Sequence, residues 1–426
     1  MEEKVLGRTI TMNKTRKRIL FAGAYGIENA GDDLPLIVMC EELKKRAPNI
    51  EFEFHALSRH PNKWEEKQYG VKMIKNLEYD SRDEATGKWF KGLNFGDDKQ
   101  DILRIRDEIK QSDLLVFGAG NFLIDITIDV FRGPVPLLAI YVFLAKLYHK
   151  PVMLYGISIG PLKTEWGKDL SRWIIENSDI VTVRDEQSKR ELKNILVKPK
   201  RIYVLPDATI GVNPAKSKRV KDILKEEGIL ESNKKKIGIA LRDLSVVLPP
   251  SSAEEALRQL ANSLNKLKDD CEFIFIPQST YKEDDDRITA RKFVQRLDSD
   301  LKYYIINHRY DPREIVGLYA YCDATLSIRL HGAVFSAIAG TPVIAMNYLP
   351  KVEGFMKSIG MDRFLINVDH IREELLLELF QEVLKNKNNL SEKINKEMNI
   401  KRKLVSQYAE LAISLLYGDQ NETKEG

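Results

Sequence analysis

At 426 residues the chain is longer than one usual domain, so we expect two domains, each large enough to bury its own core. Hydrophobic residues make up 43% and charged residues 31% of the sequence, which excludes a disordered or fibrous protein. The formal net charge of +4 argues against a dedicated nucleic-acid binder, although it allows a local cationic pocket.

The cysteines and the apolar segments bear on the cellular compartment. Cys40, Cys271 and Cys322 are odd in number and widely spaced, which argues against a disulfide framework and against a CxxC metal site. The charged stretch from Met1 to Arg18 lacks the apolar core of a signal peptide. The apolar segment from Val135 to Leu147 is too short to span a bilayer and predicts a buried helix, with a membrane-surface element as the alternative. We therefore expect a cytoplasmic protein, with peripheral contact at the inner face of the membrane left open.

The first half of the chain alternates short apolar runs with helical segments. Arg18 to Gly23 predicts a strand, and Leu34 to Ala47 follows with helical spacing. Strands that alternate with helices indicate a parallel sheet with helices on both faces. We assign residues 17–213 to this first domain and interpret the polar stretch from Tyr79 to Gln100 as a long loop or lid. Further strands are predicted at Phe52–Ala56, Asp113–Phe117, Val152–Tyr155, Ile180–Val183 and Ile202–Val204.

A lysine-rich stretch from Pro214 to Lys236 separates the two halves of the chain. A second strand series follows it, so we predict an α/β fold with two Rossmann-like parallel-sheet domains that face a cleft, the second over residues 235–370. Helices over residues 371–417 are expected to pack back on the first domain. The strands of the second series are predicted at Ile237–Leu241, Glu272–Ile276, Lys302–Ile306, Ala324–Ser327 and Pro342–Ala345.

A glycine-rich segment from Gly23 to Asp33 follows the first strand and leads into a helix. Glycine lets the backbone approach a ligand, and a helix N-terminus offers free N–H groups. Asp32 or Asp33 can cap this helix, which argues against a phosphate there. The spacing matches neither GxGxxG nor the P-loop pattern. The segment is therefore either a tight turn with a capped helix or a place where Asn29 and the two aspartates contact substrate hydroxyls.

Two further strand ends carry glycines. Gly118 and Gly120 follow the strand predicted at Asp113–Phe117, and Asn121 comes directly after them. Backbone amides at these glycines and the side chain of Asn121 could contact a ligand. The segment Gly156–Pro161 ends the next strand in the same way. Glycines at several strand ends of one domain favour one common cleft over unrelated turns.

Arg184 stands at the end of an apolar strand, ahead of Asp185 and Ser188, either of which can cap the helix that follows. An arginine at a strand end emerges near the cleft, where its planar guanidinium suits a carboxylate or a phosphate. We favour anion binding for Arg184, with a structural ion pair as the alternative.

The segment from Ser327 to Lys351 carries the strongest functional signal in the chain. A predicted strand leads into Arg329 and His331, and Gly332 permits the close approach of a ligand. A histidine in this position can exchange protons near neutral pH, and an arginine two residues away can hold an anion. We therefore predict a functional role for Arg329 and His331.

Together these segments resemble the polysaccharide pyruvyl transferase family. The resemblance rests on the glycine-rich segments, on Arg184–Ser188, and above all on Arg329–Gly332 with the sequence that follows as far as Lys351. It covers roughly Ile19 to Ile366, and the Arg-Leu-His-Gly motif is its most specific part.

The resemblance implies a two-domain fold of the glycosyltransferase-B kind, with phosphoenolpyruvate in the cleft between the domains. It implies that Arg184, Arg329 and Lys351, with close approach at Gly332, hold the carboxylate and the phosphate of this donor. His331 is then the general acid or base as the enolpyruvyl unit moves onto a sugar as a pyruvate ketal and phosphate leaves. The acceptor is a glycan or a lipid-linked oligosaccharide, and the scheme needs no metal and no cofactor. The residues expected to contact the acceptor or to line the cleft are Asn29, Asp32, Asp33, Gly118, Gly120 and Asn121.

Two other functions stay open at this point. A nucleotide-sugar glycosyltransferase of the same fold would use Arg329 and Lys351 on a diphosphate. A non-catalytic, anion-binding relative would bind the donor without turnover. The sequence leaves homo-oligomer formation undecided. We expect its lysine-rich surface, including Lys198–Arg201 and Lys234–Lys236, to be a solvated face, with contact to a membrane that carries a lipid-linked acceptor as the alternative.

Overall fold

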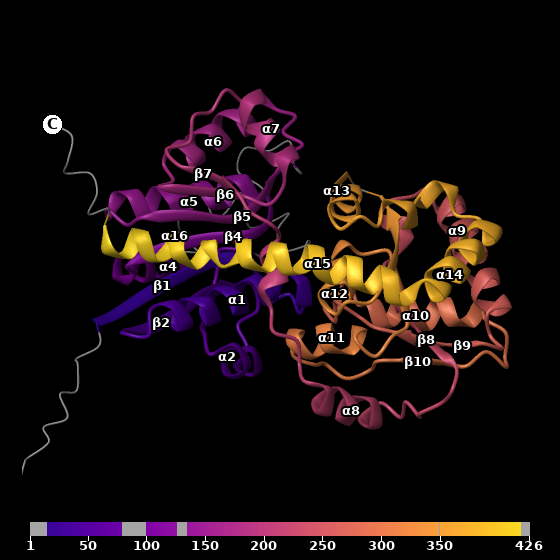
Figure 1. Cartoon of the computed structure of the whole chain (residues 1–426). Helices are drawn as coiled ribbons and strands as arrows, with labels where there is room; N and C mark the ends of the chain where they lie inside the picture. The colour runs from indigo at the N-terminus through magenta and orange to yellow at the C-terminus, as the bar shows by residue number, and fades with distance from the viewer. Residues whose placement is uncertain (1–14, 79–98, 126–133, 349, 419–426) are drawn as a thin grey trace, which may run out of the picture.

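The chain folds into two α/β domains, each built on a parallel sheet, with a helical segment at the C-terminal end (Figure 1). The computed structural model describes residues 15–78, 99–125, 134–348 and 350–418. The loop or lid predicted at Tyr79–Gln100 therefore lies outside the described residues, except for Lys99 and Gln100, which begin α4.

The first sheet has the strand order β3-β2-β1-β4-β5-β6-β7, and its neighbouring strands are parallel. The order reverses between β1 and β4, and open α/β sheets bind ligands beyond the carboxyl ends of the strands at such a reversal. The strands are β1 (Thr15–Tyr25), β2 (Ile50–Ser58), β3 (Lys72–Lys75), β4 (Leu114–Leu123), β5 (Val152–Ile159), β6 (Ile180–Val183) and β7 (Ile202–Val204). The helices are α1 (Ala30–Arg46), α2 (Lys63–Tyr69), α4 (Lys99–Gln111), α5 (Pro134–Leu147), α6 (Glu165–Glu176) and α7 (Glu186–Asn194).

The second sheet has the order β10-β9-β8-β11-β12-β13 and is also parallel, with its reversal between β8 and β11. Its strands are β8 (Lys235–Ala240), β9 (Cys271–Phe275), β10 (Tyr303–Ile305), β11 (Ala324–Ser327), β12 (Val343–Asn347) and β13 (Leu365–Asn367). The helices of this half are α8 (Ser217–Glu226), α9 (Pro250–Lys266), α10 (Asp286–Phe293), α11 (Pro312–Tyr319), α12 (Leu330–Ile338) and α13 (Pro350–Ser358).

Three helices end the described chain, α14 (Glu373–Lys385), α15 (Lys387–Val405) and α16 (Gln407–Tyr417). In the second domain α14 packs on α9, β11 and β12. The next helix, α15, contacts α12 and the short 3-10 helix η1 (Ala208–Gly211), and α16 contacts α1 and β4 of the first domain. Figure 1 shows α15 and α16, in yellow, passing from one domain to the other.

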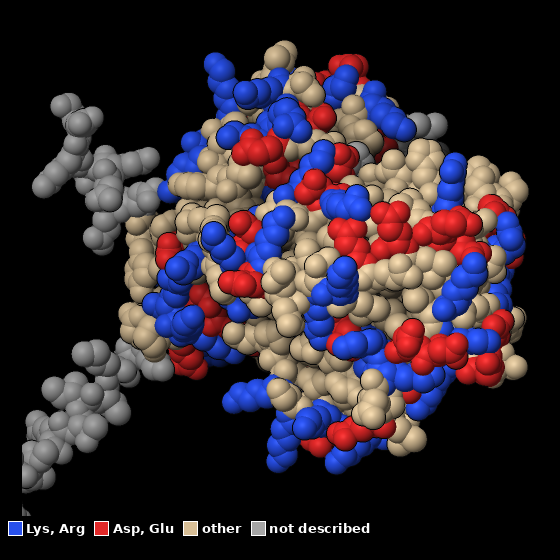
Figure 2. Space-filling model, turned by 45° about the vertical axis from the view of Figure 1, so that its right-hand side comes forward, with Lys and Arg blue, Asp and Glu red and all other residues tan. Residues whose placement is uncertain are grey.

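The surface and the short apolar helix bear on the predicted environment of the protein. The helix predicted at Val135–Leu147 is α5, in which Leu138 and Val142 are buried whereas Phe143 and Leu147 are each 56% exposed. Among the described residues no helix combines the length and the apolar character needed to cross a membrane. On the face shown in Figure 2, basic and acidic side chains are interspersed. The three cysteines are buried and unpaired.

Candidate functional site

A pocket of about 620 Å³ lies between the two domains. The first domain contributes the carboxyl ends of β6 and β7 and the start of α7, and the second domain contributes α12 and α13. Helix α15 supplies Lys401 and Leu404 to the wall. Such a site, where strand ends of two domains meet, is a common location of ligand pockets in α/β proteins. Its basic lining residues are Arg184, Arg190, Lys351, Lys357 and Lys401.

Arg184 lines this pocket from the end of β6 and is paired with Asp207, which follows β7. Nη1 of Arg184 donates to Oδ2 of Asp207 at 2.8 Å, and Nε donates to Oγ of Ser158 at 2.6 Å. The side chains of the pair are only 8% and 11% exposed. Burial acts to raise the pKa of Asp207, but Arg184 and His331 hold it below its ordinary value. Arg184 therefore forms the structural ion pair that was the alternative prediction, and it also lines the pocket, where anion binding stays a prediction.

His331 lies in the first turn of α12, where its ring stacks on Phe335 with the centroids 5.9 Å apart. The side chain of Arg329, the N-cap residue of α12, makes no capping hydrogen bond, and the N-terminus of the helix favours an anion nearby. A Cβ at Gly332 would overlap Oγ of Ser327 and Nε2 of Gln278. Gly332 is therefore required by packing within the second domain, a reason different from the ligand contact that the sequence predicts.

Burial, together with the charges around His331, sets the protonation states of the site. Burial is the main cause that lowers the pKa of His331 to about 4; Asp207 opposes this shift, and Arg184 and Lys351 add to it. Burial also lowers the pKa of Lys351 to about 8, with Arg184 as the next cause. Burial raises the pKa of Asp32 to about 6, against the effect of Lys351 and Arg184. At pH 7 His331 is therefore neutral, Lys351 is mostly charged, and Asp32 is mostly ionised.

The glycine-rich segment after β1 differs from the sequence prediction in its cap. Asn29 is the N-cap of α1, and its side chain accepts a hydrogen bond from the backbone N–H of Gly31 at 3.0 Å. Asp32 and Asp33 lie in the first turn, where the helix dipole favours negative charge. Asp32 is partly exposed, whereas Asp33 is buried and accepts a hydrogen bond from the hydroxyl of Tyr69 at 3.0 Å. The two aspartates therefore have different surroundings, and only Asp32 shares the electrostatic environment of Lys351.

Of the two glycines of β4, Gly118 allows close packing against the neighbouring strand β5, whereas Gly120 makes room for Phe122 of its own strand. Gly118 and Gly120 have φ of +143° and +151°, and a Cβ at Gly118 would overlap the carbonyl oxygen of Tyr155. The carbonyl oxygen of Gly118 also accepts a hydrogen bond from the hydroxyl of Tyr25. Asn121 differs, because its Oδ1 is buried and has no hydrogen-bond partner. A buried acceptor of this kind is suited to a ligand donor such as a hydroxyl.

Arg329 is the predicted site residue whose contacts depart furthest from expectation. Its Nε and Nη2 donate to Oδ1 of Asp286 at 2.9 and 2.7 Å, and Nη2 also donates to Asp284 at 2.8 Å. Asp286, which is 4% exposed, in turn accepts from the backbone N–H groups of Gln278 and Ser279. Arg329 thus fixes the loop after β9. We expected a solvated loop or a helix start at Asp284–Asp286: Asp286 does begin α10, but it is buried rather than solvated.

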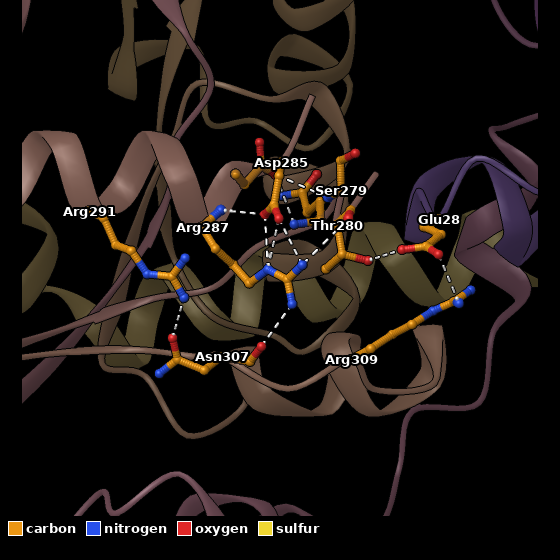
Figure 3. Close-up of polar contacts among 10 residues, drawn as sticks. Glu28, Ser279, Thr280, Asp285, Arg287, Arg291, Asn307 and Arg309 are labelled. Atoms are coloured by element: carbon orange, nitrogen blue, oxygen red, sulfur yellow. Dashed lines mark hydrogen bonds and ion pairs between the residues drawn. The ribbon is translucent and has the colours of Figure 1, made fainter. Parts of the chain in front are cut away.

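That loop meets the first domain beside the site. The carbonyl oxygen of Gln278 accepts from the backbone N–H of Ala30 at 2.8 Å, one residue after the cap of α1. Figure 3 shows the adjoining contacts, in which Glu28 accepts from Thr280 at 3.0 Å and from Arg309 at 3.1 Å. The Arg309 guanidinium also pairs with Glu65 and lies over the ring of Trp64, 4.3 Å from its centroid. These contacts form a polar seam that holds the two domains together at the start of α1.

Two residues of the site, Asp207 and Asp286, were missed by the sequence interpretation. Asp207 lies three residues after the end of the predicted strand at Ile202–Val204, so its place beyond a carboxyl end is a signal that could have been used. Asp286 gives no such signal, because its partner Arg329 is 43 residues away in sequence.

The comparisons with known proteins agree on family and fold. Residues 29–350 match the family model of the polysaccharide pyruvyl transferases. The amylovoran biosynthesis protein AmsJ of Erwinia amylovora is 23% identical over 316 residues, which are 71% of this chain and 72% of that protein.

Solved structures show the same architecture at low identity. The UDP-GlcNAc 2-epimerase of Methanocaldococcus jannaschii superposes with a TM-score of 0.60 at 14% identity, covering 94% of this chain and 100% of the other. HepE of Anabaena, solved with UDP and glucose, gives a TM-score of 0.58 at 13% identity, covering 94% and 99%. These likenesses confirm the predicted glycosyltransferase-B-like fold. The family model spans most of the chain, and the chain therefore belongs to the polysaccharide pyruvyl transferase family, whose members transfer pyruvyl groups in polysaccharide biosynthesis.

Proposed function

We propose that the chain transfers the enolpyruvyl unit of phosphoenolpyruvate to two hydroxyls of a sugar, forming a pyruvate ketal and releasing phosphate. Family membership supports pyruvyl transfer. The observation that carries the choice of donor is the presence of the cationic side chains of Arg184 and Lys351 at the pocket between the domains, with the neutral His331 within their electrostatic influence. A small donor with both a carboxylate and a phosphate suits this cationic surrounding.

Lys351 and Arg184 are the donor-binding residues of this proposal. Lys351 has no ion-pair partner among the described residues, so its charge is available to a ligand, and burial strengthens its attraction for an anion. Arg184 is held in place by Asp207 and Ser158, which orients its planar fork for a carboxylate. Arg329 acts in this proposal as a positioning residue, because its guanidinium is occupied by Asp284 and Asp286.

The reaction requires a proton at the methylene carbon of the donor and attack on its C2. One sugar hydroxyl forms a bond to C2, the bond between C2 and the phosphate oxygen breaks, and the second hydroxyl closes the ketal. One hydroxyl proton ends on the new methyl group and the other on the released phosphate. No oxidant or reductant takes part, so acid–base groups and charge stabilisation suffice.

His331 and Asp32 are the proton-transfer groups that the site offers. In the free protein His331 is neutral, since burial and three neighbouring cations lower its pKa. A bound donor brings negative charge next to those cations, which raises the proton affinity of His331 and prepares it to protonate the methylene carbon. Asp32, with a pKa of about 6, is mostly ionised at pH 7 and can accept the proton of an acceptor hydroxyl.

The acceptor in this proposal is a sugar of a polysaccharide or of its precursor. The name of AmsJ, a protein of amylovoran biosynthesis, supports an acceptor of this class. The pocket is also larger than the donor requires, with a volume of about 620 Å³, and so leaves room for a sugar ring. The buried, unpartnered Oδ1 of Asn121 is a candidate to accept a hydrogen bond from one of the sugar hydroxyls.

Calorimetric titration of the full chain with phosphoenolpyruvate, with uridine diphosphate as comparator, tests the donor. We expect phosphoenolpyruvate to bind, and binding to weaken about tenfold or more in Lys351→Ala, which loses a charged contact. Lys266→Ala is the matched control, because Lys266 pairs with Glu373 on an exposed helix surface. Phosphate release with a panel of sugar acceptors then tests turnover. Preference for uridine diphosphate would contradict the proposed donor.

A further inference from the structure

Arg242 is a basic residue just beyond the carboxyl end of β8, next to the point where the strand order of the second sheet reverses. It lies two residues beyond β8, whose neighbour β11 leads into α12 and His331. The two strand ends are joined directly, since the backbone N–H of Ile328 donates to the carbonyl oxygen of Ala240 at 2.9 Å. Arg242 therefore lies at the point of the second sheet where a ligand is expected.

The contacts of Arg242 leave its charge unneutralised. Nη1 donates to the hydroxyl of Tyr348 at 3.3 Å, and the guanidinium lies 5.8 Å from the centroid of the Tyr348 ring. No carboxylate pairs with Arg242 among the residues that the structure describes, and Asp243 next to it instead caps the backbone N–H of Ser245. Nε of Arg242 is buried without a hydrogen-bond partner. Buried donors of arginine are normally satisfied, so this nitrogen points to a group that binds there.

A second unneutralised cation lies close to Arg242. Tyr348, which holds Arg242, is three residues before Lys351, and the positive charge of Arg242 is one of the causes that lower the pKa of Lys351. Asp32 and Asp207 act on the pKa of Lys351 in the opposite direction, but neither Lys351 nor Arg242 forms an ion pair among the described residues, and an anion between the two cations would reduce their mutual repulsion. The uncapped N-terminus of α12 adds a partial positive charge on the same side of the sheet.

We infer that Arg242 and Lys351 form the seat of the phosphate group of the donor. The assignment rests on the proposed function for the identity of that donor. A phosphate monoester carries a charge near −2 at neutral pH, which balances the two unpaired cations. Arg184 already has a carboxylate partner in Asp207, so it suits the singly charged carboxylate of the donor better. The seat therefore orients the donor, with its phosphate toward the second domain and its carboxylate toward the first.

Calorimetry with inorganic phosphate, phosphoenolpyruvate and pyruvate tests this seat, because pyruvate has the carboxylate but lacks the phosphate. In Arg242→Ala we expect affinity for phosphate and for phosphoenolpyruvate to fall about tenfold or more, and affinity for pyruvate to stay within about twofold of the wild type. Arg242→Lys should recover part of the loss, because it restores the charge but not the second donor nitrogen. Arg258→Ala is the control, since Arg258 pairs with Glu255 on an exposed face of the same domain.

The outcomes separate this inference from the proposed function. Wild-type protein that binds inorganic phosphate but not phosphoenolpyruvate, with phosphate binding lost in Arg242→Ala, would retain the seat and reject the donor. Wild-type binding of phosphoenolpyruvate that persists unchanged in Arg242→Ala would overturn the seat. An equal loss of affinity for pyruvate and for phosphate would also overturn it, since the arginine would not distinguish the two groups. Arg242→Gln, which keeps most of the side-chain volume, replaces the alanine variant if that variant unfolds.

Discussion

The imidazole ring of His331 packs directly on the backbone of Gly31. Gly31 belongs to α1 of the first domain and His331 to α12 of the second. A Cβ built on Gly31 would overlap Nδ1 and Cγ of His331. The ring can therefore keep this place only while position 31 carries no side chain, and the proposed proton-transfer residue is positioned by a contact between the domains.

Gly31→Ala should lower kcat about 100-fold, because the added methyl group displaces the ring of His331 from its working position. Alanine is favoured over glycine within a helix by about 1 kcal/mol, so a weaker α1 would not explain the loss. Steady-state phosphate release by the variant, with its melting temperature measured in parallel, checks this expectation. A variant with the wild-type kcat would show that the ring tolerates displacement.

The pH dependence of kcat/KM for phosphoenolpyruvate should be bell-shaped. Asp32 must be ionised to accept a proton, so activity should rise as pH increases through its pKa of about 6. Lys351 must be charged to bind the donor, so activity should fall as pH increases through its pKa of about 8. Lys351→Arg should move the alkaline limb to higher pH, because arginine stays protonated. An alkaline limb unchanged in Lys351→Arg would assign that limb to another group.

Arg329→Ala should destabilise the fold by about 3–5 kcal/mol, because it leaves the carboxylate of Asp286 buried without its cation. The double variant Arg329→Ala, Asp286→Asn should recover part of this loss, since the unpaired charge is gone while a hydrogen-bond acceptor remains. Chemical denaturation of the two single variants and the double variant gives the coupling free energy. If Arg329→Ala kept full stability and lost donor binding, the arginine would be a direct ligand contact instead.

Arg309→Ala should weaken the seam between the domains. Glu65 is fully buried and would lose its cation, and the contact of the guanidinium with the Trp64 ring would be lost as well. We expect a loss of about 3 kcal/mol in the free energy of unfolding. Arg291→Ala is the matched control, since Arg291 is exposed and donates to Asn307 within the second domain (Figure 3), and should change stability by less than about 0.5 kcal/mol. Equal effects of the two variants on stability would show that Arg309 does not hold the two domains together.

The central strands of both sheets could be predicted from the sequence because burial on both faces makes them continuous apolar runs. Residues 19–22 of β1, for example, are fully buried. The edge strands β3 and β13 were not predicted, since Lys72–Lys75 and Leu365–Asn367 are short and have polar residues at their ends. Sequence periodicity is weak in segments of this length.

The site was predicted less completely than the fold because the role of each site residue depends on its contacts with residues distant in sequence. His331, Arg184 and Lys351 could be selected, since each follows a strand end or lies in a distinctive motif. The partner of Arg329 could not be inferred, because an arginine beside a histidine gives the same pattern whether it meets a ligand or a buried aspartate. Arg242 lies in no recognised motif, and it is marked by its buried, unpartnered Nε and by the lack of a carboxylate partner among the described residues.

The chain crosses between the domains twice, and the two crossings lie against each other. Nε of Arg402 in α15 donates to the carbonyl oxygen of Ile210 in η1 at 3.3 Å, and Gly211 packs against Val405. Two adjacent crossings of this kind favour rotation of the domains about a single line through both of them and resist sliding and twisting. Any opening of the pocket between the domains would therefore be a rotation about this line, in which the rim farthest from the two crossings moves most.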